Sequence, residues 1–431
     1  MHYFRTRLVE FGVQTGRGFR QGLRALGSRN YRLFFMGQSI SLIGLWIQRV
    51  ALSWLVYRIT LSPLSLGFVD FIGQIPIFFL TLFTGVWLER WELRKLLLIT
   101  QWMAVAQALV LAALTLSGTI LYWHIVILST FLGVVNSFDM PARQAFVIQL
   151  VDRKDDLGNA IALNSSLFNS ARLIGPSIAG IAIAAVGEGI CFLVNGLSFL
   201  ATIAALRAIR VPPREPSIRP KPGLSGVIDG LEYAFNFPPI KALLILLTLL
   251  SLFGLPYLVM LPVFAKEILG GGPKTLGYLL ASTGIGALAG TIFLALRKSP
   301  IGLGKVAAYA TALFGVALSL FSMSRVQILS ISLMPLVGFG MVLSISSCNT
   351  LIQALVEEHM RGRVMSLYVM SIIGTGPVGS LLAGASAKLF GAPLTLFIGG
   401  LVCVGASLIF FRNLPGLKAL ALPLLKEKGY S

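Results

Sequence analysis

The chain has 431 residues, of which 56% are hydrophobic and only 12% are charged, and its formal net charge is +19. A soluble globular domain carries about 25% charged residues, so this composition excludes a water-soluble fold for most of the chain. The basic residues lie in short segments between apolar runs, which indicates membrane topology and argues against a nucleic-acid partner.

The N-terminal segment 1–32 contains seven arginines and a single acid, Glu10. Phe4, Leu8 and Phe11 recur at helical spacing. We therefore expect residues 1–32 to form a basic amphipathic helix on the cytoplasmic surface of the membrane, in contact with anionic lipid. An organelle transit peptide has a similar composition and is the alternative.

Twelve apolar runs follow, each of about the 20 residues that a helical membrane span requires. They predict an all-α membrane protein with twelve transmembrane helices in two six-helix bundles, at 33–208 and 241–412. The spans are expected near 33–57, 66–88, 95–117, 121–139, 160–186, 190–208, 241–265, 275–296, 303–322, 326–348, 362–387 and 392–411.

The segment 209–240 joins the two predicted bundles. It begins with prolines at 212 and 213 and then places apolar residues on one helical face between 224 and 235. We expect a proline-stiffened cytoplasmic linker that contains one interfacial helix. Residues 413–431 are expected to form a cytoplasmic tail.

The basic residues predict the orientation. If both termini are cytoplasmic, 28 of the 35 lysines and arginines lie on the cytoplasmic side of the membrane. Because short cytoplasmic loops are enriched in these residues, we expect a multi-pass protein of the cell (inner) membrane with both termini in the cytoplasm.

The two halves repeat each other at a constant offset along the chain. The matches fall at equivalent places between and within the spans, and one earlier match needs a slip of one residue. Parallel repeats of this kind are typical of transporters whose substrate site lies between the halves near mid-membrane, and whose halves rock to alternate access. The matching pairs are Ile148-Gln149 with Ile352-Gln353, Gly158 with Gly362, Gly175 with Gly379, Gly180 with Gly384 and, with the slip, Gly85 with Gly290.

Four stretches carry a family resemblance: RNYRLFFMGQSISLIGLWIQRVALSWLVYRITLSPLSLG from Arg29, GVWLERWELRK from Gly85, DMPARQAF from Asp139 and ALNSSLFNSARLIGPSIAG from Ala162. They resemble the major facilitator superfamily, and within it the bacterial branch of enterobactin-type siderophore exporters and transmembrane secretion effectors. The resemblance covers about residues 29–412. It implies a secondary-active antiporter that exports a small organic molecule, siderophore-like or an amphipathic drug, in exchange for protons.

The loop after the second span resembles the signature of this superfamily, with Glu in place of the usual Asp. A carboxylate beside arginines at the end of a span can make charge-assisted contacts that latch the cytoplasmic side shut. Ordinary positive-inside charge is the alternative. A Pro-containing segment at the inner end of the fourth span also carries an acid and a base that we expect to act in gating. The expected gate residues are Gly85, Glu89, Arg90, Arg94, Asp139 and Arg143.

The fifth span carries Gly175, Pro176 and Gly180, which resemble the motif of antiporters and exporters in the superfamily. Glycine lets helices approach closely and proline bends the span, which would seal one pathway against leak. Simple helix packing is the alternative.

Two charges lie inside the first two spans near their outer ends. Arg49 and Asp70 differ in depth by about 6 Å at 1.5 Å per residue, within reach of an arginine side chain. A charge in a membrane must be paired or hydrated, so we expect Asp70 to titrate and couple transport to protons, with Arg49 tuning its pKa. A structural pair near the headgroups is the alternative.

A third charge, Arg172, lies in the middle of the fifth span among polar residues. Asn164 and Asn169 are on the same span and Asn195 is on the next. These four residues are candidates for a solvated cavity that contacts substrate, while helix–helix pairing is the alternative.

Motifs of other function classes are absent from the sequence. There is no G-x-x-x-x-G-K-[ST] loop for ATP, no Ser-His-Asp set and no metal-ligand spacing, so we expect no enzyme activity and no cofactor. We expect a monomer that contacts a small-molecule substrate, protons and the lipid bilayer. An uptake transporter, a lipid or lysophospholipid flippase of the same fold, and a non-transport membrane enzyme are the alternatives.

Overall fold

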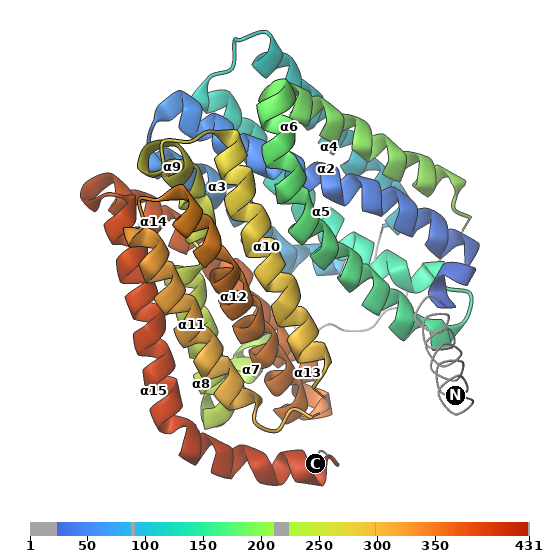
Figure 1. Ribbon diagram of the computed structural model, residues 1–431. Helices are drawn as coiled ribbons and strands as arrows, with labels where there is room; N and C mark the ends of the chain where they lie inside the picture. The colour runs from blue at the N-terminus through green and yellow to red at the C-terminus, as the bar shows by residue number, and fades with distance from the viewer. Residues whose placement is uncertain (1–23, 88–90, 211–223, 298, 430–431) are drawn as a thin grey trace, which may run out of the picture.

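The protein is described by a computed structural model that covers residues 24–87, 91–210, 224–297 and 299–429, and every regular element in these ranges is a helix (Figure 1). Helices follow from the composition, because in lipid each backbone N–H and C=O must find its partner inside its own segment. The expected amphipathic segment before residue 24 and most of the proline-rich linker lie outside the described residues.

The N-half begins with α2 (Arg29–Thr60), α3 (Pro63–Trp87), α4 (Leu93–Leu116) and α5 (Tyr122–Leu150). It ends with α6 (Leu157–Ala208), which has 52 residues and would be roughly 78 Å long if straight. Gly187 divides α6, because its φ of 77° and ψ of 171° are not helical. Glycine suits this bend because it has no Cβ to clash at positive φ. The residues on either side of Gly187 therefore form two antiparallel spans.

The C-half follows the linker helix α7 (Leu224–Asn236). Its first span combines α8, η3, α9 and η4, and its fifth combines α13, η6 and α14, where η3, η4 and η6 are single π-helical turns. The bounds are α8 (Pro238–Leu249), η3 (Leu250–Gly254), α9 (Tyr257–Val263), η4 (Phe264–Ile268), α10 (Pro273–Ala295), α11 (Leu303–Met323), α12 (Gln327–Leu355), α13 (Arg361–Val369), η6 (Met370–Gly374), α14 (Thr375–Phe390) and α15 (Ala392–Glu427).

Eleven helical segments of the described chain are long and apolar enough to span a membrane, and the bend at Gly187 makes two spans of α6. The prediction of an all-α fold with twelve spans is thus confirmed. Three helices continue well past the predicted ends of their spans. The fourth span was expected to end at 139, but α5 continues to Leu150, and the tenth was expected to end at 348, but α12 continues to Leu355. The twelfth was expected to end at 411, but α15 continues to Glu427, through most of the expected tail.

The longer α5 corrects the position of Arg143. This residue is one of the 28 basic residues assigned to the cytoplasmic side, beyond the predicted end of the fourth span, yet it lies inside α5 and its side chain is only 14% exposed. Pro141 precedes it without ending the helix. Helices packed among neighbours in a membrane tolerate an internal proline, since surrounding groups satisfy the freed carbonyl.

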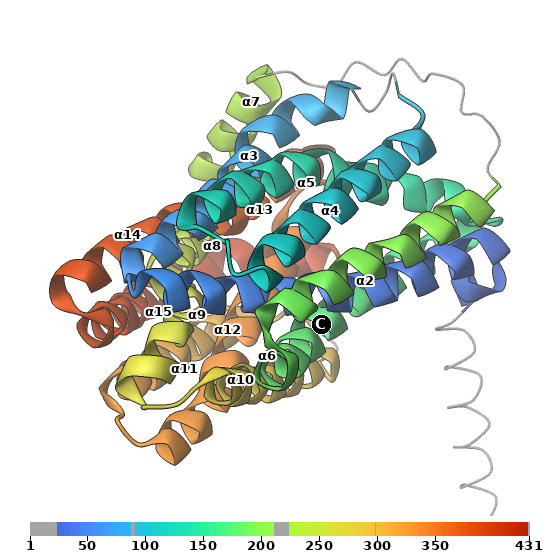
Figure 2. The same ribbon diagram turned by 90° about the horizontal axis from the view of Figure 1, so that it is seen from above.

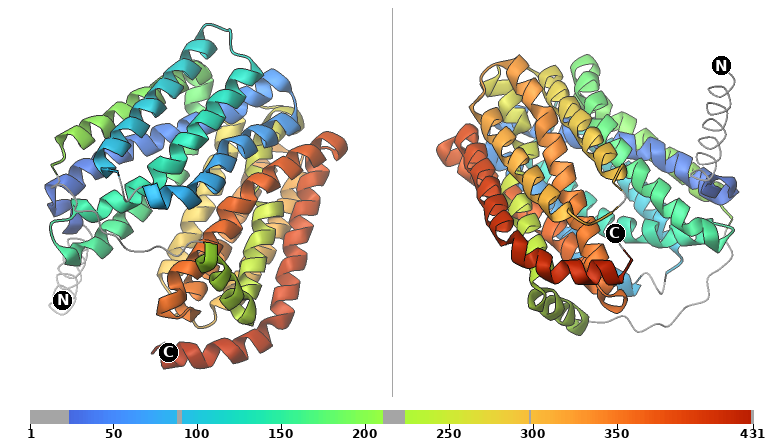
Figure 3. Two further views of the ribbon diagram at one scale, coloured as in Figure 1. Left: turned by 180° about the vertical axis from the view of Figure 1, so that it is seen from behind. Right: turned by 60° about the horizontal axis from the view of Figure 1, so that its bottom comes forward.

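The two halves pack side by side, as Figures 2 and 3 show from further directions. Two pairs of helices make the main contact between them: α3 with α14, and α6 with α10. We call the end that carries the start of α2 the inner end, and the opposite end the outer end, following the orientation that the basic residues predict. Helix α15 extends past its span and turns across the inner end of the C-half (Figure 1).

Large apolar side chains cover the flanks of the bundle. Ile127, Ile181, Ile285 and Ile409 are each at least 64% exposed. Patches of this kind on a helical bundle belong against lipid tails rather than water.

Candidate functional site

One very close approach between the halves brings Gly180 of α6 against Gly277 of α10. A Cβ atom on Gly180 would lie 2.1 Å from the Cα of Gly277 and 3.1 Å from the Pro273 carbonyl oxygen. No other residue type has room there, so the two backbones are in direct contact. Gly180 was predicted as part of an antiporter-like motif, and it lies at the boundary between the halves.

A second crossing of the same kind joins α3 to α14. A Cβ on Gly384 would lie 3.2 Å from the Cα of Gly67, and one on Gly67 would lie 2.3 Å from the Ser380 carbonyl oxygen. Gly384 matches Gly180 in the internal repeat. The two crossings are therefore pseudo-symmetric copies of one contact, both near the outer end.

Gly67 and Gly277 were not identified from the sequence as contact residues. A signal was available, because Pro63-Leu-Ser-Leu-Gly67 and Pro273-Lys-Thr-Leu-Gly277 share proline, leucine and glycine at identical spacing. Each proline begins its helix, α3 or α10, and each glycine lies one turn later. This spacing places the glycine at the outer end of the span.

The other two members of the predicted motif lie away from the boundary between the halves. A Cβ on Gly175 would lie 2.3 Å from the Cβ of Trp46, so α2 packs closely against Gly175 within the N-half. Pro176 lies inside α6, one residue later. Within the motif, the contact between the halves thus depends on Gly180.

Further contacts surround the crossings at the outer end. The Lys266 ammonium of the C-half lies 5.9 Å from the ring centre of Tyr57 in the N-half. A pocket of about 370 Å³ opens beside it, lined from both halves by residues that include Pro63, Glu267 and Lys388. The outer ends of the halves therefore meet through glycine crossings, a cation–π contact and a shared pocket.

Arg49 and Asp70 face each other, as expected from their depths. An Arg49 Nη2 atom lies 3.4 Å from Asp70 Oδ1, and the Arg49 guanidinium also lies 5.4 Å from the ring centre of Trp46. The Arg49 side chain is 54% exposed and the Asp70 side chain 19%. The pair is therefore long and partly exposed, and its role in proton coupling remains a prediction.

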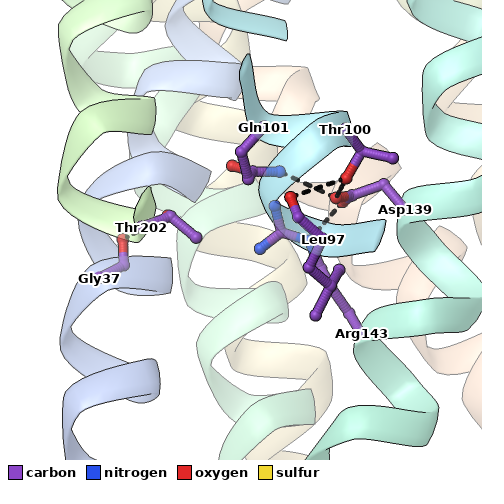
Figure 4. Close-up of polar contacts among 7 residues, drawn as sticks. All are labelled: Gly37, Leu97, Thr100, Gln101, Asp139, Arg143 and Thr202. Carbon is purple, nitrogen blue, oxygen red and sulfur yellow. Dashed lines mark hydrogen bonds and ion pairs between the residues drawn. The ribbon is translucent and has the colours of Figure 1, made fainter. Parts of the chain in front are cut away.

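Asp139 forms a buried polar cluster with residues of α4 and α5 (Figure 4). Its Oδ1 accepts hydrogen bonds from Thr100 Oγ1 at 2.7 Å and from Gln101 Nε2 at 2.8 Å, and its Oδ2 pairs with Arg143 Nε. The structure thus brings together the two predicted gating residues Asp139 and Arg143, and their gating role remains a prediction.

Thr100 and Gln101 were missed from the sequence. They interrupt the apolar run of α4 as two adjacent polar residues, which was the available signal. A polar residue inside a span usually bonds to a neighbouring helix, and here both bond to the same carboxylate.

The structure describes the side chains of two of the four predicted cavity residues, Asn195 and Asn164. Asn195 is completely buried, and its Nδ2 donates to Gln48 Oε1 of α2 at 2.8 Å, so it connects two helices of the N-half. Asn164 is half-buried in α6. The side chains of Asn169 and Arg172 lie outside the described residues, and the substrate role of the four stays a prediction.

The predicted latch is described only in part. Glu89 and Arg90 lie outside the described residues, as do the surroundings of Gly85. Arg94 Nε donates to the Leu206 carbonyl at 2.8 Å and its Nη2 to the Arg207 carbonyl at 3.0 Å. Arg94 therefore satisfies carbonyls at the C-terminal end of α6, where a cation also complements the helix dipole.

Comparison with known proteins identifies the family. The family model described as "Transmembrane secretion effector" matches residues 21–426, which is nearly the whole chain. The chain belongs to this family of major facilitator transporters. The predicted resemblance is confirmed.

Members of the superfamily from several bacteria are similar to this transmembrane secretion effector. The Staphyloferrin A transporter of Staphylococcus aureus is 27% identical over 388 residues, covering 88% of this chain and 95% of its own. The multidrug efflux pump Tap of Mycolicibacterium fortuitum is 25% identical, covering 88% and 92%. The enterobactin exporter EntS of Escherichia coli O1:K1 / APEC is 24% identical over 356 residues, covering 82% and 84%.

Solved structures of other transporters share the fold. A bacterial homologue of the human lysosomal transporter Spinster, in an inward-facing and occupied conformation, superposes with a TM-score of 0.71 at 12% identity, covering 94% of this chain and 99% of that one. At this identity the likeness supports the fold alone. The chain is a multi-pass membrane transporter of small molecules.

Proposed function

We propose that this protein is a secondary-active exporter that moves a small organic molecule, siderophore-like or an amphipathic drug, out of the cytoplasm by alternating access, in exchange for protons. The named relatives include siderophore and multidrug exporters. Both bundles contribute to the transport path, and both termini face the cytoplasm.

The paired glycine crossings carry this proposal. The outer ends of the halves meet through direct backbone contacts at two glycine pairs, Gly180 with Gly277 and Gly384 with Gly67. A contact of this kind has no interlocking side chains to disengage, so the halves can separate there and rock. In the present arrangement the transporter is closed to the outside, and export requires these crossings to open.

Proton coupling in this proposal resides at Asp70. The carboxylate lies about 10 Å from the outer end of α3, by the helical rise, and is partly exposed. When the outer side opens, Asp70 takes a proton and Arg49 loses its partner. The cytoplasmic latch formed by Glu89, Arg90 and Arg94 then closes as the outer crossings part.

The experiment is a comparison of small molecules in cells and in their medium, with the gene present, deleted and restored, under iron limitation and under iron sufficiency. Export predicts a compound that accumulates inside the deletion strain, falls in its medium, and returns to normal on restoration. An iron-chelating compound would support the siderophore-like substrate. A compound that instead falls inside the deletion strain would replace export by uptake.

A further inference from the structure

The Asp139 cluster has a hydrogen-bond pattern that packing alone does not require. The carboxylate is 8% exposed and lies about 17 Å, by the helical rise, from the inner end of α5. Asp70, in contrast, lies near the outer end of α3. The N-half therefore carries two carboxylates at different depths, Asp70 near the outer end of its helix and Asp139 in the inner part of its helix.

The C-half provides a neutral comparison for this cluster, at a register one residue away from that of Ile148-Gln149 and Ile352-Gln353 on the same helices. Counted from the first residue of each helix, Asp139 holds the same position in α5 as Ser344 holds in α12. Gln101 of α4 and Thr311 of α11 likewise hold the same position in their helices. At this place in the C-half, the Thr311 and Ser344 hydroxyls bond each other at 2.6 Å.

The C-half thus joins the corresponding two helices, α11 and α12, with a neutral pair of hydroxyls. An ion pair in a membrane is costly to bury and is usually retained for function. The crossing of α4 and α5 does not need a charge to hold it, so the charge at Asp139 calls for another explanation.

Thr100 can serve Asp139 in either protonation state. Its Oγ1 lies 2.7 Å from Asp139 Oδ1 and 3.0 Å from the Leu97 carbonyl oxygen, but it has one proton for the two acceptors. With Asp139 ionised, the hydroxyl donates to the carboxylate. With Asp139 protonated, the acid donates to Thr100, and the Thr100 proton turns to Leu97.

Gln101 has the same capacity. Its Nε2 donates to the carboxylate at 2.8 Å, while its Oε1 is buried and has no hydrogen-bond partner among the described residues. A half-turn of the amide would present Oε1 to a protonated Asp139 as an acceptor. The neutral acid would then keep a hydrogen-bond acceptor on either Thr100 or Gln101, and Arg143 would be the group that loses its partner.

The other charged groups on the surrounding helices are engaged elsewhere. Among the described residues, Arg143 is the charged side chain that contacts Asp139, and the side chain of Arg172 lies outside them. Three ion pairs account for most of the remaining charges: Asp70 of α3 with Arg49 of α2, Arg58 of α2 with Glu188 of α6, and Lys95 of α4 with Glu92. Arg94 of α4 and Arg29 of α2 donate to carbonyls of α6, and Arg207 of α6 lies over the Trp102 ring. Arg32 of α2 is exposed near the inner end.

We propose that Asp139 is a second proton-binding site of the transport cycle, on the inner side, which binds and releases its proton while Thr100 or Gln101 turns from donor to acceptor. Binding of one proton converts the carboxylate to the neutral acid and breaks the pair with Arg143. The guanidinium is then released. The proposal rests on the proposed proton-coupled export, to which it adds the inner step.

The test is infrared difference spectroscopy of the full-length purified protein in lipid bilayers, titrated with protons alone. Acidification should produce the C=O stretch of a protonated carboxylic acid, and part of that band should vanish in Asp139→Asn. The same part should persist in Asp70→Asn. An acid-induced band that is unchanged in Asp139→Asn would overturn the proposal.

A second pair of variants keeps the test decisive if Asp139→Asn does not fold. Thr100→Val removes a donor that favours the carboxylate, so the Asp139 band should appear about one pH unit or more higher. Thr311→Val removes a hydroxyl from the neutral crossing and should leave the band in place. No shift in Thr100→Val would contradict the proposal. A failure to find export in cells would contradict the proposed function instead and leave this spectrum unaffected.

Discussion

Substitution of Gly180 by alanine tests whether the glycine crossings form the outer gate. The new Cβ would lie 2.1 Å from the Gly277 Cα and 2.7 Å from its nitrogen. Carbons in contact are normally about 3.5–4.0 Å apart, so α6 and α10 must separate by roughly 1.5 Å. The obstructing atoms belong to the backbone, so no change of rotamer relieves the clash.

Overpacking of this kind costs about 1–3 kcal/mol. In our account the cost applies only while the outer ends touch, so it favours the outward-open arrangement by about 5- to 150-fold. The stability of each half should change little, because the clash lies between the halves.

Ser380 provides a reporter for this shift. It lies at the other crossing, against Gly67, and is 4% exposed, while the three native cysteines are buried. In a Ser380→Cys background, a membrane-impermeant maleimide applied from outside should label the new thiol at least about fivefold faster when Gly180→Ala is added.

The matched control is Gly158→Ala in the same helix, where a new Cβ would meet nothing within 4 Å. It should leave the labelling rate at position 380 unchanged. If Gly180→Ala gives a folded protein whose labelling rate equals that of the control, the crossings do not gate the outer side.

Two further predictions concern charged contacts. Asp70→Asn should abolish the pH dependence of transport, because it removes the group that titrates. Glu188→Gln breaks another pair at the outer end (Arg58–Glu188, 2.8 Å) and should retain the pH dependence. A flux that still depends on pH in Asp70→Asn would refute the role of Asp70 in proton coupling. Lys428→Met should speed amide hydrogen exchange at the inner end of α12. Lys428 Nζ donates to the Ala354 and Val356 carbonyls at 3.0 and 2.7 Å, and at an exposed site these two bonds stabilise the helix end by about 1 kcal/mol. Exposed Lys418→Met is its control, and equal exchange in the two variants would show that Lys428 does not hold this end.

The fold followed from the sequence because lipid leaves few choices. Each apolar run of sufficient length had to be a helix, and the repeated glycines at a fixed offset indicated two related halves. Helix ends were harder to predict. Pro141 suggests an end to the fourth span, but the packing of α5 against α3 and α4 carries the helix on to Leu150.

The site was predictable where depth alone brings residues together. Arg49 and Asp70 pair because adjacent antiparallel spans place them at similar depths. The partners of Asp139 depend instead on the rotation of α4 about its axis, which hydrophobicity does not specify when a helix is apolar all round. Arg94 was predicted as part of a latch from its charge, whereas its hydrogen bonds to carbonyls at the end of α6 depend on how α4 and α6 pack, which its charge does not specify.

Transport by inverted membrane vesicles tests proton-coupled export most directly. The vesicles contain the protein, their lumen is made acidic, and the compound identified in the comparison of cells and medium is supplied outside. Our account predicts that the compound accumulates in the lumen against its gradient and that an ionophore that collapses the pH difference stops this accumulation. Accumulation that survives the collapse, or none with the gradient intact, would contradict it.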